Sequence, residues 1–270
     1  MGSGRVTILG CGPSGGVPLI GGDWGACNPA NPRNRRRRAS ILVQGNGTTL
    51  LVDTSPDLRQ QLLDAGIGRL DAVLYTHAHA DHLNGIDDLR GINRNLGGPL
   101  RVHASHETLE AIAHRFSHVF DPLRPGAPIY RPVLVPVAIE GPFTIKGMQI
   151  VPFIQDHGLG GATLGFRFGS VAYSTDFVEL PERSFKALEG VGTWIVDCLR
   201  LAPHQTHAHL DKVLDLIERV RPARAVLTHM NQSMDYDVLA GRLPPGVEPA
   251  YDGMVIAFDD GDAMIQRVQP

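Results

Sequence analysis

Cysteine is scarce in this sequence, and long apolar segments are missing. The three cysteines, Cys11, Cys27 and Cys198, are odd in number and far apart, which does not suggest a disulfide framework. No apolar run approaches the roughly 20 residues that a membrane-spanning helix needs. Residues 1–5 lack the charged and apolar segments of a signal peptide. These absences predict a protein of the reducing cytoplasm that does not associate with membranes.

An excess of charge of either sign is also missing. The 25 basic and 28 acidic residues give a net charge of −3, which provides no general attraction to nucleic acid or to acidic membranes. The one basic cluster, five arginines within residues 33–38, is short, has no interleaved aromatic residues and leads directly into an apolar strand. We interpret it as a solvated face, with the alternative that one of its arginines contacts a substrate phosphate.

The sequence context also argues against a dinucleotide site. Residues 10–16 match the pattern Gly-x-Gly-x-x-Gly, but that fingerprint requires a helix opening inside the motif and an acidic residue about 20 positions later. Pro13 and Pro18 keep the segment irregular, and the arginine cluster occupies the acidic position. Two interpretations stay open: a plain turn, or a loop whose backbone N–H groups, together with Ser14, bind an anion.

The densest group of functional side chains lies in residues 76–82, Thr-His-Ala-His-Ala-Asp-His. It contains four metal-capable residues: His77, His79, Asp81 and His82. An apolar strand over residues 70–75 precedes it and a helical pattern follows, so these side chains lie on a loop of the kind where α/β proteins place ligands. The two histidines separated by one residue can bind one ion together, which leaves the other two side chains free to face a second. Imidazole and carboxylate suit zinc, manganese or iron; the alternative is a histidine-rich surface loop.

The same event recurs along the chain: an apolar strand stops, and a histidine or aspartate follows. These residues are Asp53, His157, Asp176, Asp197 and His229. Such repetition indicates one site built at the ends of the strands rather than coincidence. Asp53 is either a helix cap or a brace that accepts an N–H hydrogen bond from a histidine of the metal loop, and we favour the second role.

Together, the pattern His-x-His-x-Asp-His, a lone histidine, a lone aspartate and a last histidine resembles the metallo-β-lactamase superfamily of dinuclear hydrolases. The resemblance implies one α/β domain over residues 1–270 with the αββα sandwich fold, and two divalent ions, zinc or manganese, with iron as an alternative. His77, His79 and His157 would hold the first ion, Asp81, His82 and His229 the second, and Asp176 both. Hydroxide made available by the metals would be the nucleophile, and Asp81 is counted with the catalytic residues.

Further segments resemble one branch of this superfamily, the PhnP-type phosphodiesterases: residues 9–18, 174–176, 180–182, 226–229 and 251–254. That family opens 5-phosphoribosyl 1,2-cyclic phosphate and 2′,3′-cyclic nucleotides, so the resemblance implies a small phosphodiester substrate. It also implies that His207 is the general acid or proton shuttle for the leaving oxygen. From the residues alone, His204 and His209 are rivals for that role. We expect a homodimer, the common oligomeric state.

One departure from the branch concerns a structural zinc held by three cysteines and a histidine. The corresponding loop, residues 21–27, contains only Cys27, and Gln232 stands in the place of the histidine. One cysteine cannot complete a four-ligand site, so we predict no structural zinc and a loop held by packing of Trp24.

Three other functions remain as alternatives. A tRNA 3′-end endonuclease would need a basic groove, which this composition offers only at the arginine cluster. A thioester or lactone hydrolase could use the same dinuclear site. A metal-bearing binding protein without catalysis is the third alternative, although the full set of expected ligands argues against it.

Overall fold

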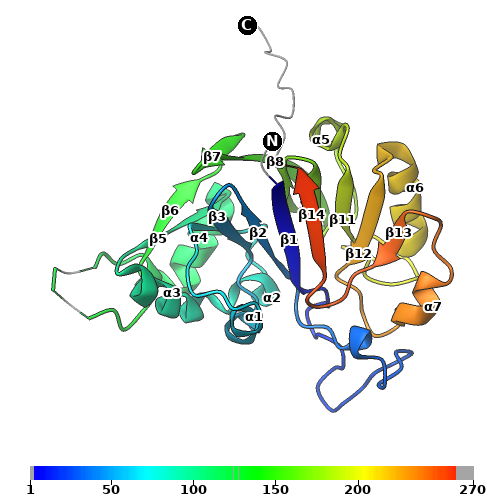
Figure 1. The fold of residues 1–270 in the computed structure, drawn as a ribbon, viewed down its shortest axis with the longest axis horizontal. Helices are drawn as coiled ribbons and strands as arrows, with labels where there is room; N and C mark the ends of the chain where they lie inside the picture. The colour runs from blue at the N-terminus through cyan, green and yellow to red at the C-terminus, as the bar shows by residue number, and fades with distance from the viewer. Residues whose placement is uncertain (1–2, 124, 127, 260–270) are drawn as a thin grey trace, which may run out of the picture.

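Two seven-stranded β-sheets face each other in the computed structural model, and helices cover the outer face of each (Figure 1). The structure describes residues 3–123, 125–126 and 128–259. This arrangement is the αββα sandwich, so the expected fold class is confirmed. The expected domain, 1–270, also includes residues that lie outside the described ones.

The first sheet has the strand order β14–β1–β2–β3–β4–β5–β6. In chain order its strands are β1 (Ser3–Gly10), β2 (Ser40–Gly45), β3 (Thr48–Val52), β4 (Ala72–Leu74), β5 (Leu100–Ala104), β6 (Leu134–Ala138) and β14 (Val255–Asp259). Strands β3 to β6 are parallel, so their C-terminal ends lie at one edge of the sheet.

The second sheet has the order β13–β12–β11–β10–β9–β8–β7. Its strands are β7 (Phe143–Ile145), β8 (Met148–Gly158), β9 (Gly161–Phe168), β10 (Val171–Ser174), β11 (Thr193–Asp197), β12 (Arg224–Thr228) and β13 (Val247–Pro249). Strands β10 to β13 are parallel, whereas β8, β9 and β10 pair antiparallel. The loops that follow the parallel strands of the two sheets lie on the same side of the sandwich.

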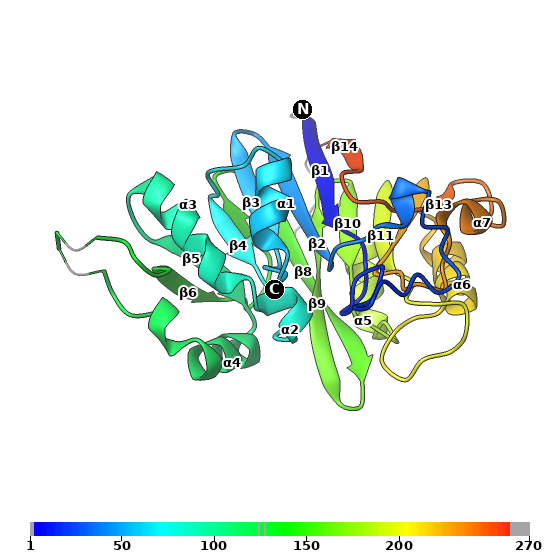
Figure 2. The same ribbon diagram turned by 90° about the horizontal axis from the view of Figure 1, so that it is seen from below.

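The helices divide between the two outer faces (Figure 2). The first sheet is covered by α1 (Leu58–Asp64), α2 (Ala80–Leu83), α3 (Leu89–Leu96) and α4 (His106–Arg115), and the second by α5 (Glu182–Leu188), α6 (Leu210–Val220) and α7 (Tyr236–Ala240). Three short 3-10 turns accompany them: η1 (Pro32–Asn34), η2 (Ile86–Asp88) and η3 (Ser117–Val119). No helix in the described part of the chain is long and apolar enough to cross a membrane.

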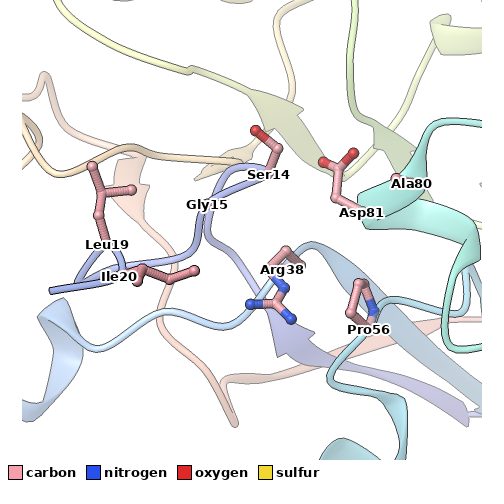
Figure 3. A pocket seen from close by; sticks show the side chains of 8 residues that line it. All are labelled: Ser14, Gly15, Leu19, Ile20, Arg38, Pro56, Ala80 and Asp81. Carbon is pink, nitrogen blue, oxygen red and sulfur yellow. The ribbon is translucent and has the colours of Figure 1, made fainter. Parts of the chain in front are cut away.

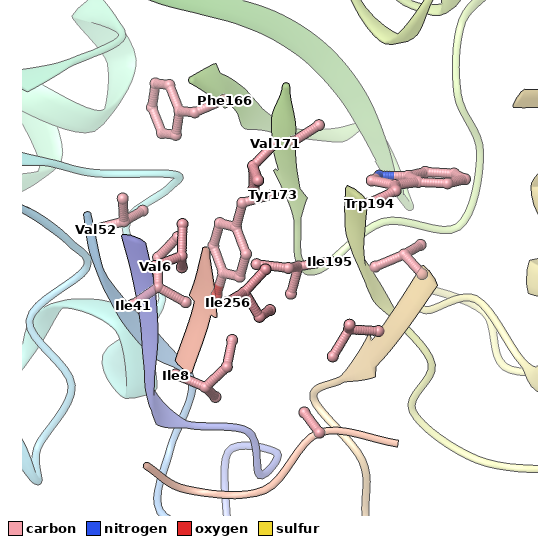
Figure 4. Packing of buried hydrophobic residues seen from close by; sticks show 14 of the residues in the cluster. Val6, Ile8, Ile41, Val52, Phe166, Val171, Tyr173, Trp194, Ile195 and Ile256 are labelled. Atoms are coloured by element: carbon pink, nitrogen blue, oxygen red, sulfur yellow. The ribbon is translucent and has the colours of Figure 1, made fainter. Parts of the chain in front are cut away.

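The larger hydrophobic core fills the space between the sheets. Figure 4 shows Val6, Ile8 and Ile41 of the first sheet facing Tyr173 and Ile195 of the second, and all five are fully buried. Burial of a large apolar side chain contributes about 1.5–3 kcal/mol, so this contact holds the two sheets together. A second core lies between the first sheet and its helices.

The arginine cluster is a solvated face only in part: Arg33 and Arg35 are exposed, Arg37 and Arg38 are half-buried, and for Arg36 the interpretation is wrong. Arg36 is 2% exposed and donates hydrogen bonds to the carbonyl oxygens of Asn231 and Met234. Arg33 lies over the rings of Tyr236 and Tyr251. A sequence of consecutive arginines does not reveal which partners distant segments supply, so the composition was misleading here.

The loop over residues 21–27 is held mainly by polar contacts rather than by Trp24, which is only half-buried beneath Arg35. The backbone N–H of Ala26 donates to the Gln232 carbonyl oxygen at 2.9 Å, and Asp23 Oδ1 accepts from the backbone N–H of Gly25 at 2.8 Å. The Arg36 guanidinium lies 3.9 Å from the Cys27 sulfur. All three cysteines are buried free thiols.

Candidate metal centre

The loop after β4 supplies four of the expected ligands. The chain stays extended through His79, and α2 begins at Ala80, so Asp81 and His82 occupy the first helical turn. The backbone N–H of Thr54 donates to the carbonyl oxygen of His82 at 2.8 Å, which ties this helix to the loop that follows β3. This hydrogen bond holds the metal loop against the segment that contains the buried Asp53.

The first cluster of ligand atoms joins the two sheets. It contains His77, His79, His157 and Asp176, whose ligand atoms all lie within 4.8 Å of one another. His157 Nε2 is 3.2 Å from His79 Nδ1, and His77 Nε2 is 3.6 Å from Asp176 Oδ2. Two ligands about 2 Å from one ion lie roughly 3–4 Å apart, so this spacing fits a single divalent cation.

The second cluster contains Asp81, His82, His229 and again Asp176. His82 Nε2 is 3.3 Å from Asp81 Oδ2 and 3.1 Å from Asp176 Oδ1, and His229 Nε2 is 3.4 Å from the same Oδ1 atom. Asp176 thus offers Oδ2 to the first cluster and Oδ1 to the second. A carboxylate in this position can bridge two ions.

Outer contacts orient three of the histidine rings so that Nε2 faces the centre. Their Nδ1 atoms have hydrogen-bond partners on the far side: His82 with Asp53 Oδ2 at 2.8 Å, His77 with Thr76 Oγ1 at 2.9 Å and His157 with the Thr206 carbonyl oxygen at 2.8 Å. His229 Nδ1 lies at ion-pair distance, 3.4 Å, from Asp197 Oδ1, and His79 turns its Nδ1 toward the centre. Such partners fix the tautomer of a metal-binding histidine.

Within the described residues, the Nε2 atoms of His77, His82 and His229 are buried and have no hydrogen-bond partner. A buried polar atom without a partner is costly, and these three converge on the carboxylate of Asp176. The residues therefore fit two divalent cations, in the grouping that the sequence implies.

The charges of the site point the same way. Burial would raise the pKa of Asp176, but His229 and His82 outweigh burial and hold that pKa well below its usual value. Burial would lower the pKa of His229, but Asp176 and Asp197 raise it to about 10. In the metal-free protein, protons on His229 and His82 therefore balance the buried carboxylates, and metal binding would release them.

His207 lies beside both clusters. Its ring stacks on His229 at 4.9 Å between centroids and meets the edge of His157 at 5.0 Å. His207 Nδ1 lies 3.1 Å from Asp197 Oδ2, which leaves Nε2 as the atom available to a substrate. The rival His204 is one ring further out, 5.3 Å from His207, and His209 caps the N-terminal end of α6.

Asp197 is the functional residue to which the sequence assigns no role. It is fully buried at the end of β11 and contacts both His207 and His229. Burial would raise the pKa of Asp197, but the two histidines lower it, so it is a carboxylate. Its position at a strand end is the signal that could have identified it, since Asp53 and Asp176 occupy equivalent positions.

A cavity of about 520 Å³ opens beside Asp81 (Figure 3). Ser14 and Gly15 form one wall, and Arg38 and Pro56 lie opposite Ser14. The glycine-rich loop and one arginine of the basic cluster therefore reach the edge of the metal centre, where Ser14 is compatible with the anion-binding alternative for this loop.

Comparison with known proteins agrees with this geometry. Residues 48–230 match the model of the beta-lactamase superfamily domain. The crystal structure of a new diphosphatase from the PhnP family is 34% identical, with a TM-score of 0.88, over 96% of this chain and 98% of that one. Octanoyltransferase of Porphyromonas gingivalis is 32% identical over 98% of this chain and 54% of its own length. Coenzyme PQQ synthesis protein B of Xanthomonas oryzae pv. oryzae is 30% identical over 55% of this chain and 51% of its length. The chain spans about half the length of these two curated relatives.

Proposed function

We propose that this chain, which belongs to the beta-lactamase superfamily and within it to the PhnP family, opens a small cyclic phosphodiester. It is a metal-dependent hydrolase. The observation that carries the finer proposal is the placement of His207 beside two ligand clusters that share Asp176. One side of the site can hold a phosphate group, and the other can give a proton to its leaving oxygen.

We propose for the expected ligands the roles that the resemblance implies. His77, His79 and His157 would hold one ion, Asp81, His82 and His229 the other, and Asp176 both. Two ions, zinc or manganese with iron as the alternative, would supply a nucleophile from water near neutral pH. Asp53 holds His82 in the tautomer that directs Nε2 inward.

His207 then acts as the general acid. Asp197 accepts from Nδ1, so the second proton of the imidazolium is carried on Nε2, on the side that faces the clusters. Transfer of this proton to the leaving oxygen neutralises the alkoxide as the bond to phosphorus breaks. Asp197 also contacts His229, so it orients the acid and one ligand together.

The substrate that best fits is a cyclic phosphate on a ribose, either 5-phosphoribosyl 1,2-cyclic phosphate or a 2′,3′-cyclic nucleotide. The neighbouring cavity is large enough for a sugar with one further group. We expect the enzyme to act on small molecules in the cytoplasm as a homodimer. The mass of the particle in light scattering would test the last expectation.

The testing experiment is turnover of a panel of phosphodiesters by metal-reconstituted protein. We expect cyclic phosphates on ribose to be cleaved faster than linear diesters, and a chelator to abolish both reactions. No cleavage of any member, with two metal ions bound per chain, would contradict the proposal. A lactone, a thioester and a precursor tRNA in the same panel would then identify an alternative activity, and inertness toward all of them would leave a binding protein.

A further inference from the structure

The cavity beside Asp81 contains the two sequence features that the metal centre does not use, the glycine-rich loop and the basic cluster. We propose that Arg38 and the turn carrying Ser14 form a subsite for a second anionic group of the substrate, a phosphate monoester remote from the reacting diester. This inference rests on the proposed function and assigns the residues that would select its substrate.

The loop is built as a rigid turn. The backbone N–H of Gly16 donates to the Pro13 carbonyl oxygen at 2.8 Å, and Gly16 has a φ of +66°, which a residue without a side chain adopts readily. Both ends of the turn pair with the basic cluster, Gly12 with Arg38 and Val17 with Arg36. The tip, Ser14 and Gly15, is exposed and faces the cavity.

Close packing keeps this loop against the arginines. A Cβ added at Gly12 would lie 2.9 Å from the carbonyl oxygens of Arg36 and Arg37, so a larger residue would push the turn away. A Cβ added at Gly16 would lie 3.9 Å from Arg38 Nη1. The guanidinium therefore lies next to the base of the turn.

Arg38 is held from one side only. Its Nε lies 3.0 Å from Asp57 Oδ2, and the same carboxylate oxygen accepts from the Arg38 backbone N–H at 2.9 Å. Among the residues that the structure describes, neither Nη atom has a hydrogen-bond partner. The side chain is 27% exposed, and in Figure 3 its guanidinium points into the space between Ser14 and Pro56.

Unused donors on Ser14 and Gly15 complete the subsite. The Ser14 hydroxyl and the backbone N–H groups of Ser14 and Gly15 donate to no acceptor among the residues that the structure describes. A guanidinium offers two parallel donors that match a phosphate, and successive backbone N–H groups in a turn form an anion-binding concavity. Leu19, Ile20, Pro56 and Ala80 supply apolar wall, and Asp81 marks the side of the metal centre. Arg38 is the basic residue among those that line the cavity.

Calorimetry on the zinc-loaded protein would test the subsite without turnover. The probes are adenosine 3′-monophosphate and adenosine 3′,5′-bisphosphate, which differ only in the remote phosphate. We expect the wild type to bind the bisphosphate about 10- to 100-fold tighter, the effect of charge-assisted hydrogen bonds. Arg38→Gln is expected to bind both probes about equally.

Arg37→Gln is the matched control, because Arg37 is the next residue in the cluster but pairs with Asp64 outside this cavity. We expect it to keep the wild-type preference. Equal affinity of the wild type for the two probes, or a preference that survives in Arg38→Gln, would overturn the inference. Should Arg38→Gln lose its metals, Arg38→Lys replaces it: lysine lacks the paired donors, so an unchanged preference would contradict the subsite. Failure of the proposed function would show separately, as absent turnover of 2′,3′-cyclic nucleotides.

Discussion

His207 is the residue whose replacement separates acid catalysis from metal chemistry. We predict that His207→Gln lowers kcat by about 10²- to 10⁴-fold on cyclic phosphates, because their ribose alkoxide leaves poorly without a proton. On bis(p-nitrophenyl) phosphate the loss is expected to be much smaller, since p-nitrophenolate leaves without one. Steady-state kinetics on both substrates would measure the difference.

His204→Gln serves as the control for that prediction, because His204 lies one ring further from the ligand clusters. We expect this variant to have nearly the wild-type kcat on both substrates. If instead His204→Gln reproduced the selective loss and His207→Gln did not, the proton donor would be His204.

Asp53 acts on the metals through His82. Asp53 is fully buried and accepts hydrogen bonds from His82 Nδ1 and from the backbone N–H and hydroxyl of Thr76. We predict that Asp53→Ala lowers metal affinity by about 10- to 100-fold, as measured by metal content after dialysis against a graded chelator. Asp53→Asn keeps an acceptor, so its metal affinity should lie between those of the wild type and Asp53→Ala. Unchanged metal content in Asp53→Ala would reduce Asp53 to a purely structural role.

The individual site residues that could be predicted are those whose position along the chain is informative. The expected ligands follow strands or lie in a dense local motif, so their grouping into two clusters could be anticipated. Asp197 also follows a strand, so its place in the site was predictable, but its partners were not, and Arg36 carries no signal of this kind. Their roles depend on His207, Asn231 and Met234, which only the tertiary structure brings close.

Among the elements, the short helix α2 depends on one glycine. A Cβ added at Gly85 would lie 2.0 Å from the Ser55 carbonyl oxygen and 2.9 Å from the Leu58 Cβ, both in the segment that follows Asp53. We predict that Gly85→Ala destabilises the protein by about 3 kcal/mol and lowers its metal content, because α2 carries Asp81 and His82. Thermal unfolding and metal analysis would measure both effects.

Gly91→Ala is the matched control within the next helix. A Cβ added at Gly91 meets no atom within 4 Å, and alanine is favoured over glycine in a helix interior by about 0.5–1 kcal/mol. This variant should be slightly more stable than the wild type and retain its metals. Equal destabilisation by the two substitutions would show that space at α2 is not the cause.

The regular elements were predictable because burial on both faces of the parallel strands produces continuous apolar runs. The segment over residues 11–39 was not, since its conformation depends on pairing between the glycine-rich loop and the basic cluster. Local propensity carries no signal for contacts of this kind.

For the whole molecule, Asp252 ties the C-terminal part of the chain to the first loop. Its carboxylate accepts from the backbone N–H groups of Cys11 and Arg37. Burial raises the pKa of Asp252 from 3.8 to about 6. Because the folded state holds the proton more tightly, the resulting stability is fully present below pH 3.8 and is lost as the pH rises through 6.

We predict that Asp252→Asn removes this dependence. Between about pH 3 and pH 7 the free energy of unfolding of the variant should rise by about 3 kcal/mol relative to that of the wild type. The loss of one acceptor adds an offset that does not change with pH. Urea unfolding of both proteins in chelator at the two pH values would measure the difference, and parallel pH profiles would refute the assignment.

Each ligand cluster draws on both sheets, with residues 77–82 on one side and His157, Asp176 and His229 on the other. An ion bound by either cluster would therefore cross-link the two sheets. On the scale known for disulfides, closing a loop of roughly 150 residues restricts the unfolded chain by about 4–5 kcal/mol. All three cysteines are free thiols, so bound ions would add to the hydrophobic core the cross-links that disulfides supply in other proteins. A reductant would leave these cross-links intact, whereas a chelator would remove activity and their contribution to stability together.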